Sequence, residues 1–214
     1  MRVEIWSDVV CPWCYVGTLR FSAAVERFDG DVEVAYRAFE LDPTVPAGGM
    51  DLAEYLTRKF GGSGAVDRSH DRLTRMGADV GVDFRWEGKR RVNTFDAHRL
   101  GVWAEGAGGI EARAALEQRL FRAYFADNDD VSDGGVLAGL AADAGLDAGA
   151  AAEALASGAG AGEVRAEERQ ATELGISAVP TFVIEGRWAI PGAQDVDTFV
   201  QVLQRAAERL VPGQ

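Results

Sequence analysis

The sequence predicts an α/β protein in which both ends of the chain supply strands and the long middle segment is helical. Three observations lead to this class. Strand and helix patterns alternate in residues 3–40, helical spacing dominates from about residue 51 to residue 173, and two strand patterns and a helix follow from residue 180. The two ends make a single α/β unit only if they fold together around the middle.

The amino-terminal part is predicted to form a strand, a helix and a strand. Residues 3–7, VEIWS, are a short β-prone run, and apolar residues then recur at helical spacing from Cys14 to Phe28. Residues 31–40 alternate with the two-residue period of a strand. Such a unit implies two parallel strands joined by a right-handed crossover.

The middle of the chain carries two apolar stripes at helical spacing, which indicate a helical subdomain. Residues 82–92 interrupt it as a loop or a short extended piece, and the Ala/Gly-rich tract 144–162 indicates short helices around a mobile joint. A run of charged residues near the end of this segment is expected to be a solvated helix face. The first stripe is Leu116, Leu120 and Tyr124, the second is Val136, Leu137, Leu140 and Ala144, and the charged run is Glu163, Arg165, Glu167, Glu168 and Arg169.

The carboxyl-terminal part predicts a hairpin and a helix. Residues 180–190, PTFVIEGRWAI, indicate two strands around a tight turn that contains Gly186. Asp195 is placed to cap a final helix whose apolar residues share one face.

The charge balance argues against two classes of partner. The 214 residues include 22 basic and 34 acidic ones, and this formal net charge of −12 repels nucleic acid phosphates and anionic lipids. The sequence shows no signal-peptide pattern and no apolar run of about 18 residues. We therefore expect no nucleic acid partner, no membrane partner and a cytoplasmic location, whereas the oligomeric state stays open.

The only two cysteines of the chain stand together in the motif CPWC, as Cys11 and Cys14, at the predicted junction of the first strand and helix. At this spacing two residues share a helix face, with a Cα separation of about 5–6 Å that a disulfide allows. In a reducing cytosol such a pair is more typical of redox or metal chemistry than of a structural disulfide. Metal is disfavoured, because the other soft ligand candidates, His70 and His98, lie far off in sequence.

The two thiols are expected to play different roles. Cys11 lies at the amino end of the helix, where free N–H groups and the helix dipole favour a thiolate, and Cys14, one turn further in, lacks this help. We therefore expect Cys11 to exchange with the sulfur of the partner and Cys14 to resolve the mixed disulfide. Pro12 suits the first helical turn, where its missing N–H would have had no partner.

Three stretches together resemble the DsbA family of thioredoxin-fold oxidoreductases, and in particular its FrnE-like branch: SDVVCPWCYVG (7–17), GISAVPTFVI (175–184) and IPGAQ (190–194). The resemblance runs nearly end to end. It implies a thioredoxin-like fold with a large helical domain inserted between its two halves. The halves would be residues 1–45 and 175–214, and the insert residues 46–174.

The resemblance also implies the chemistry, which is thiol–disulfide exchange with protein or small-molecule thiols. Pro180 should be a cis-proline that faces the cysteine pair, leaving the backbone of Val179 to pair with an extended substrate segment. No bound cofactor is implied, because the redox-active Cys11–Cys14 disulfide does the chemistry itself. Glutathione is a candidate co-substrate, alongside a recycling redox partner, and the direction of exchange stays open between oxidase, reductase and isomerase.

Four further residues have a functional and a structural interpretation. Asp8 either acts on the thiols, by raising the pKa of a thiolate or relaying a proton, or holds the turn by accepting loop N–H groups. Trp13 either offers substrates an exposed apolar surface or packs on the insert. Asn93 and His98 belong to VNTFDAHRLGVWA (92–104), which resembles a segment of glutathione-dependent relatives that lies toward their substrate or thiol cleft. In the structural interpretation Asn93 caps a helix and His98 packs in a helix interface.

Two other functions compete with thiol–disulfide exchange. The first is a glutathione-dependent isomerase or transferase, like the kappa-class transferases and the 2-hydroxychromene-2-carboxylate isomerases. These relatives carry serine where this chain has Cys11, so the intact cysteine pair argues against that function. The second is a holdase that binds unfolded chains through the cleft without chemistry.

Overall fold

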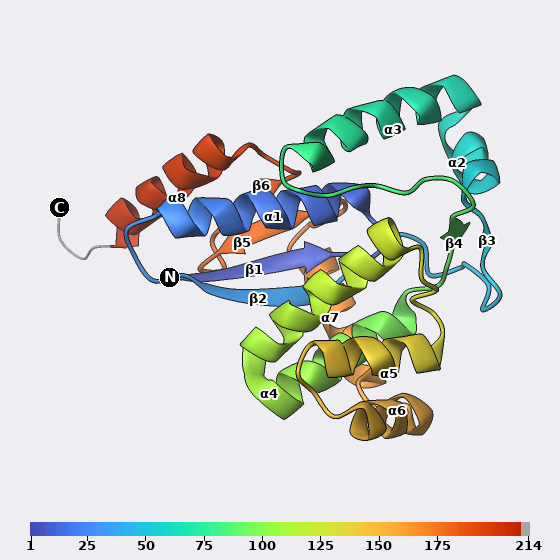
Figure 1. Cartoon of the computed structure of the whole chain (residues 1–214). Helices are drawn as coiled ribbons and strands as arrows, with labels where there is room; N and C mark the ends of the chain where they lie inside the picture. The colour runs from blue at the N-terminus through green and yellow to red at the C-terminus, as the bar shows by residue number, and fades with distance from the viewer. Residues whose placement is uncertain (211–214) are drawn as a thin grey trace.

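The main sheet joins the two ends of the chain. The computed structural model describes residues 1–210, and the strand order in its main sheet is β2-β1-β5-β6 (Figure 1). β1 runs parallel to β2 and antiparallel to β5, and β5 runs antiparallel to β6. The strands are β1 (Arg2–Ser7), β2 (Glu33–Ala38), β5 (Thr181–Ile184) and β6 (Trp188–Pro191). Because both ends of the chain share this sheet, the predicted α/β class is confirmed.

The segment between β2 and β5 is mostly helical, as predicted, and contains a separate two-stranded sheet. In chain order it comprises β3 (Met50–Asp51), α2 (Leu52–Phe60), α3 (Ser63–Ala78), β4 (Arg90–Arg91), α4 (Phe95–Arg122), the π-helical turn η1 (Ala123–Asp127), α5 (Gly134–Asp143), α6 (Ala148–Ser157) and α7 (Ala161–Glu173). The domain boundaries given above stay a prediction, and residues 211–214 of the last segment lie outside the described residues.

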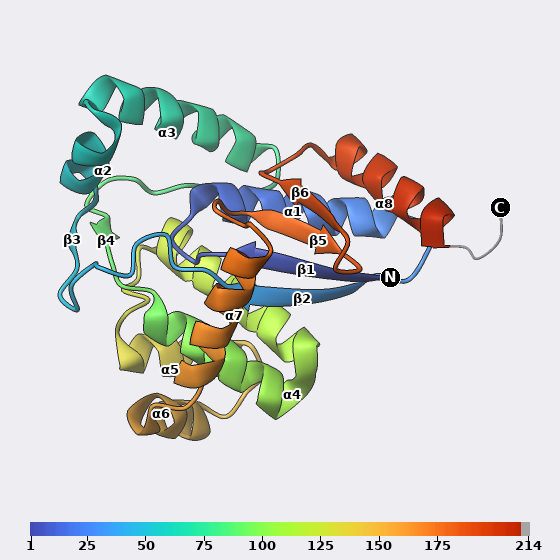
Figure 2. The ribbon, with the colours of Figure 1, turned by 180° about the vertical axis from the view of Figure 1, so that it is seen from behind.

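Helices cover the sheet on two sides. α1 (Pro12–Arg27) and α8 (Val196–Leu210) pack against each other above the strands in Figure 1, and α3 contacts α1 there. α4 and α7 contact β2 from below, as Figure 2 shows from behind. The helical segment therefore reaches both sides of the sheet, and its α2–α3 pair lies beside the start of α1.

Three aromatic rings fix α1 on the sheet. Phe21 of α1, Phe182 of β5 and Phe199 of α8 are almost fully buried, and their ring centroids lie 4.7–5.2 Å apart. Aromatic pairs at such distances contribute beyond the area that they bury. The helix that begins at the cysteine pair is thus held by residues from the carboxyl-terminal part of the chain.

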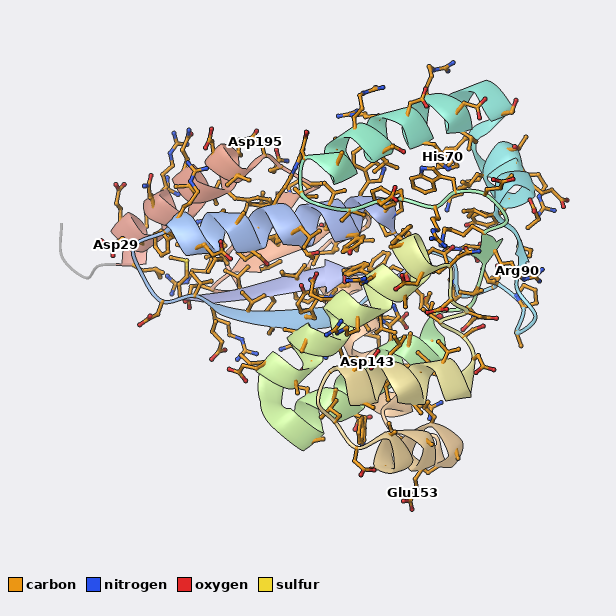
Figure 3. All side chains as sticks on the ribbon, in the orientation of Figure 1. Asp29, His70, Arg90, Asp143, Glu153 and Asp195 are labelled. Atoms are coloured by element: carbon orange, nitrogen blue, oxygen red, sulfur yellow. The ribbon has the colours of Figure 1, made fainter. Side chains whose placement is uncertain are left out.

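Several local predictions are confirmed. The stripe Leu116, Leu120 and Tyr124 is buried in α4 and η1. Glu185 and Gly186 both have positive φ in the turn between β5 and β6, which is the geometry of a tight hairpin turn. The Asp195 carboxylate accepts the Thr198 N–H at 2.8 Å and caps α8 (Figure 3).

The prediction that the charged run of α7 is a solvated face is wrong for Glu167. Its side chain is only 14% exposed and accepts two hydrogen bonds from the buried Arg113 guanidinium, both at 2.8 Å. Helical spacing explains the placement, because Glu167 shares a face with the buried Val164 and Ala171. The ion pair joins residues 54 positions apart, so local charge patterning cannot reveal it.

Close packing at Gly17 leads to a first prediction. A Cβ at Gly17 would lie 3.0 Å from Pro180 Cγ and 3.3 Å from Ala193 Cβ, so a larger side chain must displace the loop that faces the cysteines. Gly17→Val is expected to lower the free energy of unfolding by about 1–3 kcal/mol, measured by urea denaturation. Ser22→Val, at an exposed position of the same helix, is the control, and equal effects of the two variants would contradict this packing.

Candidate active site

The two cysteines lie where β1 gives way to α1. After Ser7 the chain turns, and the Cys11 N–H donates to the Asp8 carbonyl at 2.9 Å. Cys11 is the N-cap of α1, Pro12 occupies the first helical turn, and the Cys14 N–H donates to Cys11 Sγ at 3.4 Å. A thiolate at Cys11 would therefore face a backbone donor at the positive end of a helix.

Burial distinguishes the two thiols. Both are free and buried, but Cys11 keeps 3% of its surface exposed and Cys14 keeps none. Burial raises the pKa of the Cys14 thiol well above its usual value, and the hydrogen bond and charge of Cys11 raise it further. Cys14 is therefore a protonated, inaccessible thiol in the reduced protein, while Cys11 lies at the surface of a cavity.

The loop before β5 lies against Cys11. The Val179–Pro180 peptide bond is cis, and Cys11 Sγ donates to the Val179 carbonyl at 3.7 Å. The Pro180 carbonyl accepts the Gly192 N–H at 2.8 Å, which ties the loop to the end of β6. Residues 168 positions apart thus meet because β1 and β5 are neighbours in the sheet.

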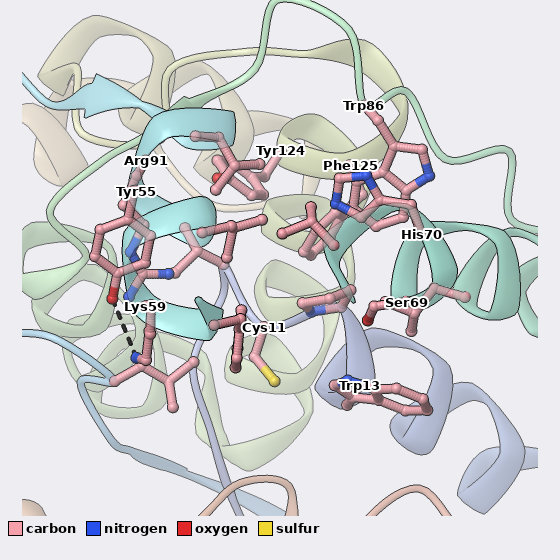
Figure 4. Close-up of a pocket in the computed structure, with 18 of the residues that line it drawn as sticks. Cys11, Trp13, Tyr55, Lys59, Ser69, His70, Trp86, Arg91, Tyr124 and Phe125 are labelled. Carbon is pink, nitrogen blue, oxygen red and sulfur yellow. Dashed lines mark hydrogen bonds between the residues drawn. The ribbon is translucent and has the colours of Figure 1, made fainter. Parts of the chain in front are cut away.

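A cavity of about 260 Å³ opens beside Cys11. Its lining is mainly apolar and comes from the start of α1, from α2 and α3, from the loop that leads to β4, and from η1 (Figure 4). The lining includes Cys11, Trp13, Tyr55, Lys59, His70, Trp86 and Arg91. Sequence reasoning did not identify the cavity, although one of its lining residues, Phe60 of α2, is a large apolar side chain that is 60% exposed.

Trp13 packs on the helical segment, as its structural interpretation states, and it also lies at the cavity. It is half-buried, and the Arg72 guanidinium of α3 lies 5.1 Å from its ring centroid, so Trp13 packs on the helical segment. It also lines the cavity next to Cys11. A compound held at Cys11 would therefore meet an indole ring on one side.

Asp8 holds the turn and also neutralises buried cations. Its carboxylate is fully buried and accepts the Leu41 N–H at 2.8 Å and the Val10 N–H at 3.4 Å. The same carboxylate lies 3.6 Å from His98 Nε2 and 3.8 Å from Arg91 Nη2. One carboxylate thus serves two basic side chains, which come from α4 and β4.

The pKa values of Asp8 and His98 shift in opposite directions. Burial would raise the pKa of Asp8, but the interactions with His98, Arg91 and the Leu41 N–H outweigh burial and lower it below its usual value. Burial would likewise lower the pKa of His98, and the interaction with Asp8 outweighs it and raises that pKa. Asp8 and His98 therefore favour the charged pair.

His98 lies outside the cavity lining, behind the cysteine turn. It is fully buried, and the charges of Glu117 and Arg113 act on its pKa. Burial raises the pKa of Glu117, although the charges of His98 and Arg113 oppose this rise. His98 is thus buried in the protein interior, in agreement with its structural interpretation.

Asn93 also lies away from the cavity. Its amide donates to the Val45 carbonyl at 3.1 Å, and its Oδ1 accepts the Phe95 N–H at 3.0 Å at the start of α4. Asn93 therefore ties the loop after β2 to the beginning of that helix, although Thr94 rather than Asn93 is its N-cap residue. Neither Asn93 nor His98 lines the cavity at Cys11.

The described chain offers neither a cluster of metal ligands nor a membrane-spanning helix. Within residues 1–210, no group of three or more His, Cys, Asp or Glu side chains is arranged to hold a metal ion. None of the helices in the same residues is both long enough and apolar enough to cross a membrane.

A sheet of order β2-β1-β5-β6, a cysteine pair at the start of α1 and a proline loop opposite it define a thioredoxin-fold protein with a dithiol site. The segment between β2 and β5 contains a helical insertion into that fold. The chain belongs to the DSBA-like thioredoxin domain family, whose model matches residues 2–204.

Three similar proteins are consistent with membership of this family. A structure from Streptomyces coelicolor, described as a probable DsbA oxidoreductase (SCO1869), is 38% identical in sequence to this chain and has a TM-score of 0.92. The match covers 100% of this chain and 93% of the Streptomyces chain. YwbO of Bacillus subtilis, an uncharacterized protein, is 27% identical over 95% of this chain and 96% of its own length. The cytosolic disulfide reductase DsbM of Pseudomonas aeruginosa shares the fold, with 21% identity, 98% and 100% coverage and a TM-score of 0.68.

Proposed function

We propose that this protein is a thiol–disulfide oxidoreductase that exchanges disulfides with protein or small-molecule thiols through Cys11 and Cys14. The observation that supports this best is the inequality of the two thiols. Cys11 caps a helix at a cavity and accepts a backbone hydrogen bond, and Cys14 is fully buried one turn behind it. Membership of a DsbA-like oxidoreductase family supports the same class of reaction.

The proposed reaction has two steps. The Cys11 thiolate attacks one sulfur of a substrate disulfide, a new S–S bond joins Cys11 to that sulfur, and the second substrate sulfur leaves as a thiolate. Cys14 then loses its proton and attacks Cys11 Sγ, which releases the first substrate sulfur as a thiolate and closes the Cys11–Cys14 disulfide. The protein gives up two electrons and the substrate gains them, and the reverse sequence oxidises a dithiol substrate.

For a peptide substrate, we propose that the loop before β5 supplies the binding surface. Ser177 and Ala178 are exposed, and Val179 places its carbonyl beside Cys11. An extended segment that pairs with this backbone would bind with little sequence preference. Pro12 would keep the first helical turn free of a competing N–H donor next to the reacting sulfurs.

We propose no bound cofactor, with glutathione or a recycling redox partner returning the pair to its starting state. The proposed compartment is the cytosol, where the cysteine pair would be kept reduced; DsbM, which shares the fold, is described as cytosolic. A glutathione-dependent isomerase needs no thiol of its own, and a holdase needs no redox chemistry. Neither makes use of the unequal cysteine pair.

A trapping experiment tests the proposal. Without a resolving thiol the first mixed disulfide cannot be released internally, so Cys14→Ser incubated with oxidised glutathione is expected to gain one glutathionyl group at Cys11, detected by mass spectrometry after acid quenching. The wild type should instead form its internal disulfide. Cys11→Ser is the control and should gain no adduct. Equal adducts on both single variants, or none on Cys14→Ser, would overturn the proposed function.

A further inference from the structure

The cavity beside Cys11 is a local exception to the acidic character of the chain. The protein carries a formal net charge of −12, yet none of the described residues that line the cavity is Asp or Glu, and Lys59 and Arg91 both line it. Figure 4 shows these two cations on one side of the cavity, together with Tyr55. A cavity of this kind favours an anionic group over a neutral one.

Arg91 has unused hydrogen-bonding capacity. Its side chain is only 5% exposed, and its Nε has no hydrogen-bond partner within the described part of the chain. Its closest carboxylate is Asp8, 3.8 Å from Nη2, beyond hydrogen-bond distance and shared with His98. A buried guanidinium that lacks partners is costly unless a ligand supplies them. Tyr55 covers one face of it, with the ring centroid 5.2 Å away, so ligand oxygens would approach its edge.

The opposite side of the cavity is an aromatic wall. His70 stacks on Trp86 with ring centroids 4.0 Å apart and planes 6° apart, and Phe125 lies edge-on to Trp86 (Figure 4). His70 Nε2 is buried and also lacks a hydrogen-bond partner in residues 1–210, although its neighbours Asp67 and Asp71 contribute negative charge. Flat rings of this kind favour a planar ligand.

We propose that this cavity binds a small aromatic thiol or disulfide that carries a carboxylate. The carboxylate would lie at Arg91 and Lys59, the ring against Trp86 and His70, and the sulfur at Cys11. Binding itself needs only the cavity, whereas the reaction with Cys11 rests on the proposed function. In that reaction Cys11 forms an S–S bond with one half of the disulfide and the other half leaves as an aromatic thiolate.

Two matched disulfides test the proposal on the reduced wild-type protein. The compound 6,6′-dithiodinicotinic acid carries a carboxylate on each ring, and 2,2′-dithiodipyridine is the same disulfide without them. Stopped-flow absorbance gives the rate constant of Cys11 with each reagent, and the constant for the dicarboxylate is divided by the constant for the neutral disulfide. This ratio is then divided by the same ratio measured with free 2-mercaptoethanol, which removes the difference in intrinsic reactivity of the two reagents. We expect this normalised ratio to be at least about tenfold, as one charged hydrogen bond allows.

Variants locate the effect. Arg91→Gln should bring the normalised ratio near one, and Lys59→Gln, at an exposed position, should lower it without a risk to folding. Arg90→Gln is the matched control, because the exposed Arg90 is adjacent in sequence but does not line this cavity (Figure 3). It should leave the ratio unchanged.

The outcomes separate the two proposals. A normalised ratio near one in the wild type, with both reagents reacting at Cys11, would overturn the carboxylate site and leave the proposed function standing. A ratio that falls equally in Arg90→Gln and Arg91→Gln would also overturn the site. A failure of Cys11 to react with either reagent would overturn the proposed function.

In that case binding alone can still test the carboxylate site, by Trp fluorescence with two compounds that cannot exchange disulfides. 6-(Methylsulfanyl)nicotinate should bind at least about tenfold tighter than 2-(methylsulfanyl)pyridine. Equal affinity of the two compounds would overturn the site.

Discussion

Replacing Cys11 with serine is expected to lower the rate of disulfide exchange by at least about 10³-fold, because the attacking thiolate is lost and nothing nearby can replace it. Cys14 is the only other cysteine, it is fully buried, and burial raises its pKa well above the usual value. The measurement is the single-turnover rate of the reduced protein with 2,2′-dithiodipyridine at pH 7.

Cys14→Ser is the matched control for this prediction. It removes the same kind of group from the same helical turn but leaves Cys11 and its place at the cavity unchanged. Its first attack should stay within about tenfold of the wild-type rate. If Cys11→Ser kept more than a tenth of the wild-type rate, or if both variants lost the same fraction, the roles assigned to the two thiols would be wrong.

Asp8→Asn is expected to lower the free energy of unfolding by about 3–5 kcal/mol at pH 6, because it leaves His98 and Arg91 buried without their shared counter-charge. Urea denaturation of the reduced protein measures the effect. Asp29→Asn is the control, at an exposed residue far from the cysteines, near the carboxyl end of α1 (Figure 3). It should change stability by less than about 0.5 kcal/mol.

The pH dependence of this difference has a defined sign. Asp8 has a lowered pKa in the folded protein, so its contribution is complete above its unfolded value of 3.8 and is lost as the pH falls through the folded value. His98 has a raised pKa, so its contribution is complete below its unfolded value of 6.5 and is lost as the pH rises through the folded value. The advantage of the wild type over Asp8→Asn should therefore be largest between these two values. An advantage that does not change from pH 3 to pH 9 would contradict the charged pair.

The parts of the site that depend on local sequence were predictable. The strand-to-helix junction at Cys11, the cap at Asp195 and the hairpin turn at Gly186 each follow from a few adjacent residues, and each lies where the sequence placed it. The joining of the two ends into one sheet was predicted only through the resemblance to the DsbA family, because the strand and helix patterns left open whether the two ends fold together.

The cavity could not be predicted, because its walls come from elements that meet only in the folded protein. Tyr55 and His70 lie on different helices and Arg91 lies on a separate strand. Their periodicity indicates buried faces but not which faces converge on Cys11. The prediction that Glu167 lies on a solvated face was wrong for the same reason, because its partner Arg113 lies on another helix. His98 belongs to a segment that resembles a cleft-lining segment of glutathione-dependent relatives. In this fold His98 lies behind the cysteine turn, against Asp8.

The most direct test of the central claim is the redox equilibrium of the Cys11–Cys14 pair. The protein would be equilibrated in glutathione buffers of graded ratio and acid-quenched, and its free thiols would be counted by mass after alkylation. We predict one two-electron transition in which both thiols disappear together as an internal disulfide forms; a potential toward about −120 mV would mark an oxidant and one toward about −270 mV a reductant. If no internal disulfide forms at any ratio, the account of this site as a dithiol exchange centre is wrong.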